Sequence, residues 1–426
     1  MNRVPSPGQF AAPLPTGSPQ TCPSPWLSVL GIGEDGLEAM APAARALLRS
    51  AAHVFGGARH LALAEPLIYG TANPWPSPMK DGCAAILRRR GEAVAVLASG
   101  DPFCFGVGSA LRALVEDGEM LCIPAPSAFS LARARLGWAM QEVAELSFCG
   151  RPIEAMRPRL RPGARLLCLS ADAATPARVE AYLHAEGFGR SRLTLLEALG
   201  AERERVRDIT AGVPGTVDAL NLLAIEVAAE PGARVLPLAV GLPDTWFEND
   251  GQITKREIRA VTLSALAPRE GELLWDLGAG SGSVSIEWML QNPRNRAVAV
   301  ETRPDRAARA ARNALSLGVP GLRVVTGTVP EALEGLEPPD AVFVGGGAST
   351  AGVLEAGWTA LRPGGRIVAN VVTVEGEMAL MHAWDRWGGE LTRIGVERLD
   401  QVGRMHGMRP AMTVTQWSAV RSVGAP

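Results

Sequence analysis

Residues 273–287 read LLWDLGAGSGSVSIE, and this stretch decides the fold of the C-terminal half of the chain. The apolar run at its start predicts a buried β-strand that ends near Asp276, and the apolar residues after position 283 recur at helical spacing. Between strand and helix stand Gly278, Gly280 and Gly282, which allow the backbone to come close to a ligand. Because the helix offers free amide groups at its start, the pattern predicts a nucleotide-binding turn.

The sequence on both sides of this turn alternates strands with helices. An amphipathic helix is predicted over residues 253–266, with Ile258, Val261, Leu263 and Leu266 on one side. Five strands are then predicted in the segments ELLWDLG, RAVAVET, LRVVTG, DAVFVGG and RIVANVV. This alternation favours an α/β class with a mostly parallel, doubly wound, Rossmann-like sheet.

The N-terminal half shows the same rhythm. From Trp26 onward the apolar segments WLSVLGIG, HVFGG and AVAVLASGDP alternate with helical stretches, and a second such block begins near Met120. This pattern predicts a second α/β domain built from two subdomains.

A chain of 426 residues is too long for one ordinary core, which favours two or three domains. The turn-rich segment GLPDTWFENDG marks the boundary between the two halves. The predicted organisation is a disordered, Pro-rich tail over 1–25, a first domain over 26–240 with subdomains 26–122 and 123–240, a linker over 241–253, and a second domain over 254–426.

The composition restricts the possible partners and the location. The formal charge of -2 gives no general attraction to nucleic acid or to an anionic membrane. We expect no signal peptide, and no stretch approaches the roughly 20 apolar residues of a membrane span. The six cysteines show no C-x-x-C spacing and no histidine partner at metal spacing, so we expect no metal site, no disulfide framework, and a cytoplasmic protein.

The C-terminal turn has to be assigned to one kind of cofactor. Its G-x-G-x-G spacing departs from the G-x-G-x-x-G of dinucleotide sites, and Glu301 follows the next predicted strand, where it can accept hydrogen bonds from two ribose hydroxyls. Together with the LRPGGRIV turn, this resembles the class I S-adenosylmethionine methyltransferases. An NAD site and a glycine turn used only for tight packing are the alternatives.

Three motifs in the N-terminal half, VLGIGEDG, LASGDPFCFGVG and PAPSAFSLARARLG, resemble the tetrapyrrole methylase family in their order. That family also uses S-adenosylmethionine and binds it in a trough between two α/β subdomains. The resemblance implies that the following residues bind the cofactor: Gly31, Gly33, Gly100, Asp101, Pro102, Phe105, Ser127 and Ala128.

The C-terminal half resembles the decarboxylating precorrin methyltransferases in the segments ITKREIRA, LWDLGAGSGSVSIE, TGTVPEAL and RIVANVVTVEGE. One departure is the pair Thr328 and Val329, which stands where the family often has an acid. The resemblance implies a second cofactor site formed by Thr254, Asp276, Gly278, Ala279, Gly280, Ser281, Gly282, Glu301, Thr328 and Val329.

Together the two resemblances imply a bifunctional enzyme of cobalamin (corrin) biosynthesis. Such an enzyme methylates precorrin-6B at carbons 5 and 15 with two molecules of S-adenosylmethionine and decarboxylates the ring C acetate, giving precorrin-8. The N-terminal half is then expected to methylate carbon 5, and the C-terminal half to methylate carbon 15 and decarboxylate. Both families tend to self-associate, so a homo-oligomer is expected. The alternatives are that only one half is catalytic and the other a scaffold or cofactor sensor, or that the C-terminal domain methylates RNA.

Candidates for the catalytic residues lie outside the cofactor loops. Lys255, Asn370 and His406 are candidates for contacting substrate carboxylates or moving a proton, as is Arg259. Each has an alternative role. Lys255 and Arg259 lie one turn apart on a predicted helix, where a solvent-exposed face is the default. For His406, the alternative to a pocket acid is a histidine in a loop without a role in the reaction. For Asn370, at a strand end, the alternative is a position that does not face the substrate.

Overall fold

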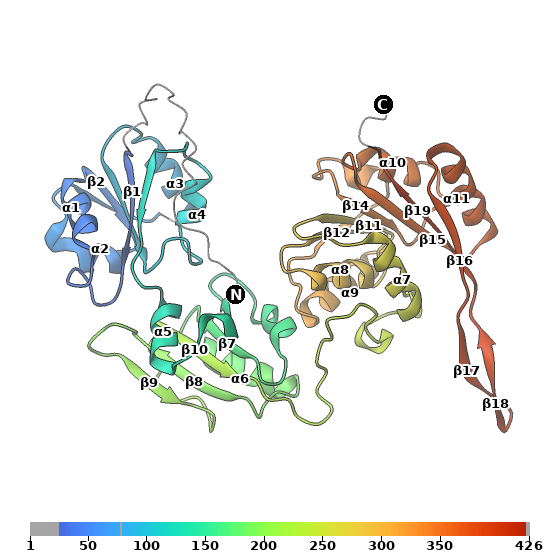
Figure 1. Ribbon diagram of the computed structural model, residues 1–426, viewed down its shortest axis with the longest axis horizontal. Helices are drawn as coiled ribbons and strands as arrows, with labels where there is room; N and C mark the ends of the chain where they lie inside the picture. The colour runs from blue at the N-terminus through green and yellow to red at the C-terminus, as the bar shows by residue number, and fades with distance from the viewer. Residues whose placement is uncertain (1–24, 77–78, 423–426) are drawn as a thin grey trace, which may run out of the picture. The chain divides into compact units, whose positions relative to one another are not determined.

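The computed structural model describes residues 25–76 and 79–422, and Figure 1 shows their elements. The chain divides into two compact units. Of the described residues, the first unit contains those up to Ser147 with Thr194–Asp208 and Gly215–Ala224. The second unit contains Phe148–Leu193, Ile209–Pro214 and the described residues from Ile225 onward. None of the helices in the described ranges is long and apolar enough to cross a membrane.

The first unit contains a five-stranded, wholly parallel sheet in the order β3-β2-β4-β1-β5. Its strands are β1 (Leu27–Ile32), β2 (His53–Gly56), β3 (Thr71–Pro74), β4 (Val94–Ser99) and β5 (Met120–Ile123). Helices cover both faces of this sheet. The side chains of the central strands point alternately to the two faces and there join two separate apolar clusters. These helices are α1 (Pro42–Ser50), α2 (Ala58–Ala64), α3 (Met79–Leu87) and α4 (Gly108–Arg112), with the short η1 (Glu65–Leu67) after α2.

The middle of the chain forms a second five-stranded sheet in the order β6-β7-β10-β8-β9. Its strands are β6 (Val143–Ser147), β7 (Arg165–Leu169), β8 (Arg192–Glu197), β9 (Arg205–Asp208) and β10 (Asn221–Glu226). The helical segments here are α5 (Ala128–Leu136), η2 (Met140–Glu142), η3 (Ile153–Arg159) and α6 (Thr175–Ala185). Strands β8 and β9 pair antiparallel.

The C-terminal half contains a seven-stranded sheet in the order β13-β12-β11-β14-β15-β19-β16. The strands are β11 (Leu273–Leu277), β12 (Arg296–Glu301), β13 (Arg323–Thr326), β14 (Ala341–Val344), β15 (Arg366–Val371), β16 (Glu390–Ile394) and β19 (Val414–Val420). The first five are parallel, and β19 runs antiparallel between β15 and β16. A two-stranded arm of β17 (Glu397–Val402) and β18 (Met405–Pro410) extends beyond this sheet.

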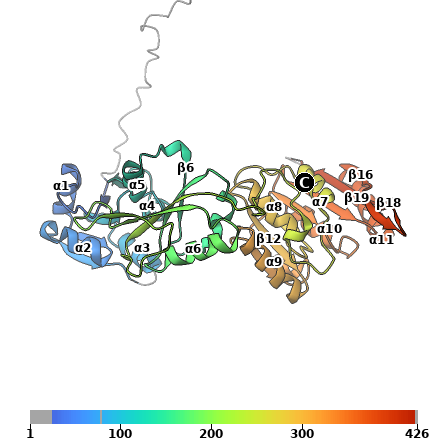
Figure 2. The same ribbon diagram turned by 90° about the horizontal axis from the view of Figure 1, so that it is seen from below.

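Helices cover both faces of the C-terminal sheet, as Figures 1 and 2 show. The face toward α7 (Arg256–Leu266), α8 (Ser283–Gln291) and α9 (Pro304–Ser316) is filled by Leu274, Trp288 and their neighbours. The opposite face, toward α10 (Val353–Ala360) and α11 (Val374–Trp387), takes Leu273, Trp275 and Leu277. Short turns η4 (Asp244–Trp246) and η5 (Glu331–Leu333) complete the elements. Because successive side chains of β11 are buried alternately on the two faces, nearly all of its residues are apolar.

The predicted α/β class and the doubly wound C-terminal sheet are confirmed by this topology. All five strands predicted after residue 270 are present, as β11 to β15. The apolar side predicted for the helix before them was partly wrong, because Val261 is 41% exposed whereas Arg259 and Thr262 are buried. The predicted tail over 1–25 lies, except for its last residue, outside the described residues.

Candidate functional site

The loop between β11 and α8 carries backbone amides to the edge of the C-terminal sheet. Gly278, Gly280 and Gly282 have φ angles of 74°, 57° and 74°, a region that favours glycine because a side chain there strains the backbone. A Cβ atom on Gly278 would lie 2.8 Å from the carbonyl oxygen of Gly346. The loops after β11 and β14 are therefore in backbone contact, and we call them the C-terminal cradle.

Two buried acids lie at the C-terminal cradle. Glu301, the last residue of β12, accepts hydrogen bonds from the amides of Gly280 at 2.8 Å and Arg303 at 3.0 Å. Asp276 is 1% exposed and accepts two bonds from Ser285 through one carboxylate oxygen, at 3.2 Å from the amide and 2.7 Å from the hydroxyl. Its other oxygen, Oδ1, has no hydrogen-bond partner among the described residues.

The electrostatics of Asp276 follow from this burial. Loss of hydration raises the pKa of Asp276 to about 6, and the bonds from Ser285 oppose that shift. A buried carboxylate with one unpaired oxygen is energetically unfavourable by itself. It is therefore suited to a ligand that brings a cationic or hydrogen-bond-donating group.

The remaining predicted residues of the C-terminal site lie around the same loop. Ala279 donates its amide to Val300 at 3.1 Å, and the hydroxyl oxygen of buried Ser281 has no hydrogen-bond partner in the described part of the chain. A Cβ atom on Gly280 would lie 3.7 Å from the carbonyl oxygen of Gln252. The segment that leads to Thr254 thus passes beside the cradle.

The loop after β13 approaches from the other side. The amide of Gly327 donates to the carbonyl of Glu301 at 3.0 Å, which places the next two residues near that acid. The hydroxyl of Thr328 bonds to Glu331 at 3.0 Å, and Val329 packs against the core beneath α10 and α11.

The three catalytic candidates lie on different elements. Lys255 is the residue that precedes α7, and its Nζ donates to the carbonyl of Gly251 at 3.4 Å. Asn370 in β15 donates to Thr262 at 2.7 Å and accepts from Gln416 at 2.9 Å. His406 lies in β18, on the arm that extends beyond the sheet. The described contacts do not join the three.

Arg259 is a fourth candidate, and neither a solvent-exposed nor a substrate-facing position was right for it. Its side chain is 0% exposed and donates to Glu287 at 2.5 Å and to Asp244 at 3.1 Å. It also donates to the backbone carbonyls of Thr254 and Leu242. Arg259 therefore fixes residues 242–254 onto α7 and α8, a structural role that helical spacing does not reveal.

In the first unit, the three predicted motifs meet through their backbones. A Cβ atom on Gly31 would lie 2.0 Å from the carbonyl oxygen of Gly100 and 2.3 Å from the amide nitrogen of Ala125. The amide of Ala125 also donates to the carbonyl of Gly100 at 3.0 Å. Only glycine fits at position 31, and we call this arrangement the N-terminal cradle.

The other predicted residues of this half surround the N-terminal cradle. The carboxylate of Asp101 accepts from the amide of Phe103 at 2.8 Å, and the carbonyl of Pro102 accepts from the amide of Gly108 at 2.8 Å. Ser127 caps α5, which starts at Ala128, through a bond from the amide of Ser130 at 3.1 Å.

Two further residues beside this cradle have unusual backbones or close contacts. Phe105 has a φ of 54° and is 47% exposed, with its ring 5.8 Å from that of Phe129. A positive φ is rare for a bulky residue. A Cβ atom on Gly33 would lie 2.4 Å from Oδ1 of Asp35, which shows how tightly the first loop turns.

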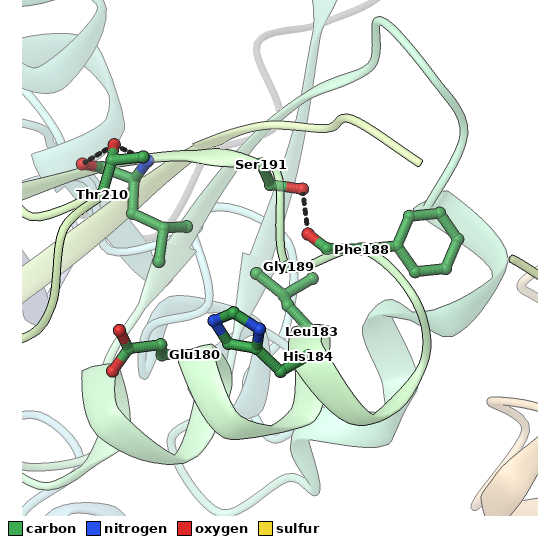
Figure 3. A pocket seen from close by; sticks show the side chains of 8 residues that line it. Glu180, Leu183, His184, Phe188, Gly189, Ser191 and Thr210 are labelled. Carbon is green, nitrogen blue, oxygen red and sulfur yellow. Dashed lines mark hydrogen bonds between the residues drawn. The ribbon is translucent and has the colours of Figure 1, made fainter. Parts of the chain in front are cut away.

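A small pocket lies elsewhere, beside α6, and Figure 3 shows its lining. It is lined by Glu180, His184, Phe188 and neighbouring residues, and the hydroxyl of Ser191 donates to the carbonyl of Phe188 at 2.7 Å. It contains none of the predicted site residues, and we assign it no function. Among the described residues, no group of three or more His, Cys, Asp or Glu side chains is placed to hold a metal ion.

Comparisons with known proteins match both halves. Residues 27–213 match the family model "Tetrapyrrole (Corrin/Porphyrin) Methylases", and residues 245–421 match the model "Precorrin methyltransferase domain". A Precorrin-6Y C(5,15)-methyltransferase [decarboxylating] from Sinorhizobium sp is 54% identical over 93% of this chain and 96% of its own length.

Two other relatives cover about half of the chain. A probable cobalt-precorrin-6B C(15)-methyltransferase (decarboxylating) from Pyrobaculum calidifontis is 35% identical over 42% of this chain and 96% of its own length. The crystal structure of the C-terminal domain of precorrin-6Y C5,15-methyltransferase from Rhodobacter capsulatus is 47% identical, covers 44% of this chain and 100% of that one, and has a TM-score of 0.42.

Proposed function

The chain belongs to the precorrin-6Y C(5,15)-methyltransferase (decarboxylating) family, and from this premise we propose that it binds one S-adenosylmethionine in each half. We further propose that it methylates carbons 5 and 15 of a reduced tetrapyrrole and decarboxylates one acetate side chain. The proposed substrate is precorrin-6B and the product precorrin-8. We also propose the domain bounds predicted above, with residues 241–253 as the linker.

The observation that supports this proposal is the pair of cradles. In each half, a glycine at or just beyond the end of a central strand touches the backbone of a loop that follows a neighbouring strand. Such backbone surfaces suit a nucleoside-like ligand that lies across both strand ends. At the C-terminal cradle, the unpaired oxygen of Asp276 and the strand-end carboxylate of Glu301 fit a ligand with a cationic group and ribose hydroxyls.

The chemistry requires little from the protein beyond positioning. When bound, S-adenosylmethionine supplies an electrophilic methyl group, and the bridge carbons of a reduced tetrapyrrole are nucleophilic through conjugated enamine nitrogens. The cradles would fix the reacting partners in line, an effect worth roughly 7–11 kcal/mol. Because charge on the donor is lost in the transfer, a site that excludes water favours the reaction. The conjugated macrocycle itself accepts the electron pair left when carbon dioxide departs.

We assign carbon 5 to the N-terminal half and carbon 15 with decarboxylation to the C-terminal half. The single-domain relative from Pyrobaculum carries only the carbon 15 activity and the decarboxylation in its name, and it is similar in size to the C-terminal half. Lys255, Asn370 and His406 stay candidates for proton transfer or substrate contact. Location in the cytoplasm also stays a prediction.

Counting cofactor sites tests the proposal. Calorimetric titration of the full chain with S-adenosylmethionine is expected to show two sites, with Gly31→Ala removing one and Glu301→Ala removing the other. Mass spectrometry of the products should then show loss of one methyl group for each variant. One site in the unaltered chain would instead support a scaffold or sensor role for one half, and loss of both products in either folded variant would contradict independent sites.

The predicted homo-oligomer has a candidate surface on the arm. Leu399, Val402, Met405 and Met408 are 58–73% exposed on β17 and β18. By the strand register they form two cross-strand pairs, Leu399 with Met408 and Val402 with Met405, on opposite faces of the arm. Exposed apolar side chains that lie together are typical of contact surfaces. We propose that the arm joins copies of this chain.

A further inference from the structure

Two arginines on strand β9 form ion pairs with one buried acid. Arg205 and Arg207 stand at alternate positions, so they project to the same face of the strand. Both contact the carboxylate of Glu197 in the neighbouring strand β8, at 3.2 Å and 2.7 Å. Glu197 is 0% exposed, whereas the two guanidinium side chains are 49% and 30% exposed.

Two further arginines continue this arrangement toward the N-terminal cradle. Arg203 contacts Asp218 at 3.1 Å and Glu34 at 3.3 Å, and Arg59 also pairs with Glu34. Glu34 is only 8% exposed and directly follows Gly33 of the first cradle loop. We call Arg59, Arg203, Arg205 and Arg207 the arginine row.

The arginine row begins beside the proposed cofactor loops. A guanidinium nitrogen of Arg59 donates to the hydroxyl of Ser99 at 3.2 Å, and Ser99 is the residue before Gly100. Its neighbour His60 bonds to the same hydroxyl at 2.8 Å. A ligand bound by the arginine row would therefore extend to the N-terminal cradle.

Fold stability alone does not account for the row. Exposed ion pairs contribute about 0–1 kcal/mol each, and one arginine is enough to compensate a buried carboxylate. Here four guanidiniums share three acids, Glu34, Glu197 and Asp218. Each guanidinium has five N–H donors in a fixed geometry, so some of its donors are not used by the acids. The acids hold the guanidinium groups in place, and the group of four arginines and three acids keeps one net positive charge.

We infer that the arginine row binds the acetate and propionate carboxylates of the tetrapyrrole during methylation in the N-terminal half. This inference rests on the proposed function, because it takes a polycarboxylate as the substrate. Guanidinium forks match carboxylates in a bidentate way, and alternate positions along a strand space them for neighbouring side chains of one macrocycle. The net surplus of one positive charge is small for a nucleic-acid surface, which needs many phosphate contacts.

The test uses the full chain with Arg203→Gln and Arg205→Gln combined. This choice leaves Glu34 paired with Arg59 and buried Glu197 paired with Arg207. Asp218 loses its ion pair with Arg203 but keeps the hydrogen bond from the amide of Leu220 at 2.8 Å. The KM for the tetrapyrrole in carbon 5 methylation is expected to rise by about 10-fold or more, because charge-assisted hydrogen bonds are lost. The affinity for S-adenosylmethionine and the rate of carbon 15 methylation should stay within about 2-fold of the unaltered chain.

A matched control and a stable probe complete the experiment. Arg192→Gln removes an arginine that is 63% exposed on β8 and pairs with Glu226, and it should leave the KM unchanged. Fluorescence titration with uroporphyrin, which carries eight carboxylates, should show the same loss of affinity in the double variant. The variant with lysine at both positions should recover part of it.

The outcomes are distinguishable. An unaltered chain that makes no 5-methyl product contradicts the proposed function itself. An unaltered chain that makes it, with an unchanged KM in the double variant, overturns only the arginine row. Poly(U) RNA is a competitor in the same titration. If it displaces uroporphyrin from the unaltered chain and binding of the RNA is lost in the double variant, the row is a nucleic-acid surface and the inference is overturned.

Discussion

Replacing Asp276 by asparagine tests whether the burial of this acid makes the stability of the fold depend on pH. The pKa of Asp276 is raised from 3.8 to about 6 by burial. In an unfolded chain the carboxyl ionises near 3.8, so the folded state holds the proton more tightly. Below pH 3.8 both states are protonated and there is no penalty. As the pH rises from 3.8 to 6, the unfolded chain ionises while the folded state keeps the proton, so the free energy of unfolding falls. Above pH 6 both states are ionised, and the penalty stays constant.

The magnitude follows from linkage. The penalty is about 1 kcal/mol at pH 4.5 and about 3 kcal/mol at pH 8. Asp276→Asn removes this pH-dependent part and adds a constant cost, because its NH₂ group needs a new partner. The difference in unfolding free energy between variant and unaltered chain should therefore shift in favour of the variant by about 2 kcal/mol between pH 4.5 and pH 8.

Urea unfolding followed by tryptophan fluorescence measures this shift, since most of the ten tryptophans lie in the C-terminal half. Asp250→Asn is a control of opposite sign. Hydrogen bonds from Arg306 lower the pKa of Asp250 to about 2, so its stabilisation is present above pH 3.8 and is lost as the pH falls through 2. That variant should be less stable than the unaltered chain at pH 8. A difference for Asp276→Asn that is equal at both pH values would refute the reasoning.

Three other changes give separate tests. Gly31→Ala places a methyl group 2.0 Å from the oxygen of Gly100, so calorimetry should show loss of the N-terminal cofactor site with the C-terminal site intact; two remaining sites would contradict the cradle. Arg259→Met leaves Glu287 buried without its main cation and should cost about 3–5 kcal/mol in urea unfolding, with partial recovery when Glu287→Gln is added; no loss would mean that Arg259 is dispensable. Leu399→Lys with Met405→Lys should lower the mass in light scattering if the arm joins copies, and an unchanged mass would assign the contact elsewhere.

The sequence was most informative where structure is local. The strand and the glycine turn at residues 273–287 were found because apolar periodicity and backbone freedom are properties of neighbouring residues. The arm was missed because β17 and β18 are almost wholly exposed, so no burial shapes their composition. A signal was present in Gly403, which with Arg404 forms the two-residue loop between paired Val402 and Met405.

The arginine row and the role of Arg259 were out of reach for a different reason. The alternation of Arg203, Arg205 and Arg207 is visible in the sequence, but it is also common on solvent-exposed strands. What distinguishes the row is Glu34, which is 169 positions away from Arg203. Likewise, Arg259 looks exposed by helical spacing, and only its contact with Glu287 on another helix shows that it is buried.

The two cradles share a physical cause although their sequences do not resemble each other. Gly31 lies in β1 and Gly100 follows its parallel neighbour β4; Gly278 follows β11 and Gly346 follows its parallel neighbour β14. Parallel neighbours end at the same edge of a sheet, so the loops that follow them begin side by side. If a ligand is to lie across both strand ends, the loops must pass at backbone distance, and a Cβ on the first glycine would overlap the second segment in each case. Either glycine alone is therefore a weak signal, and only the contact between the paired loops distinguishes a binding cradle from a tight turn.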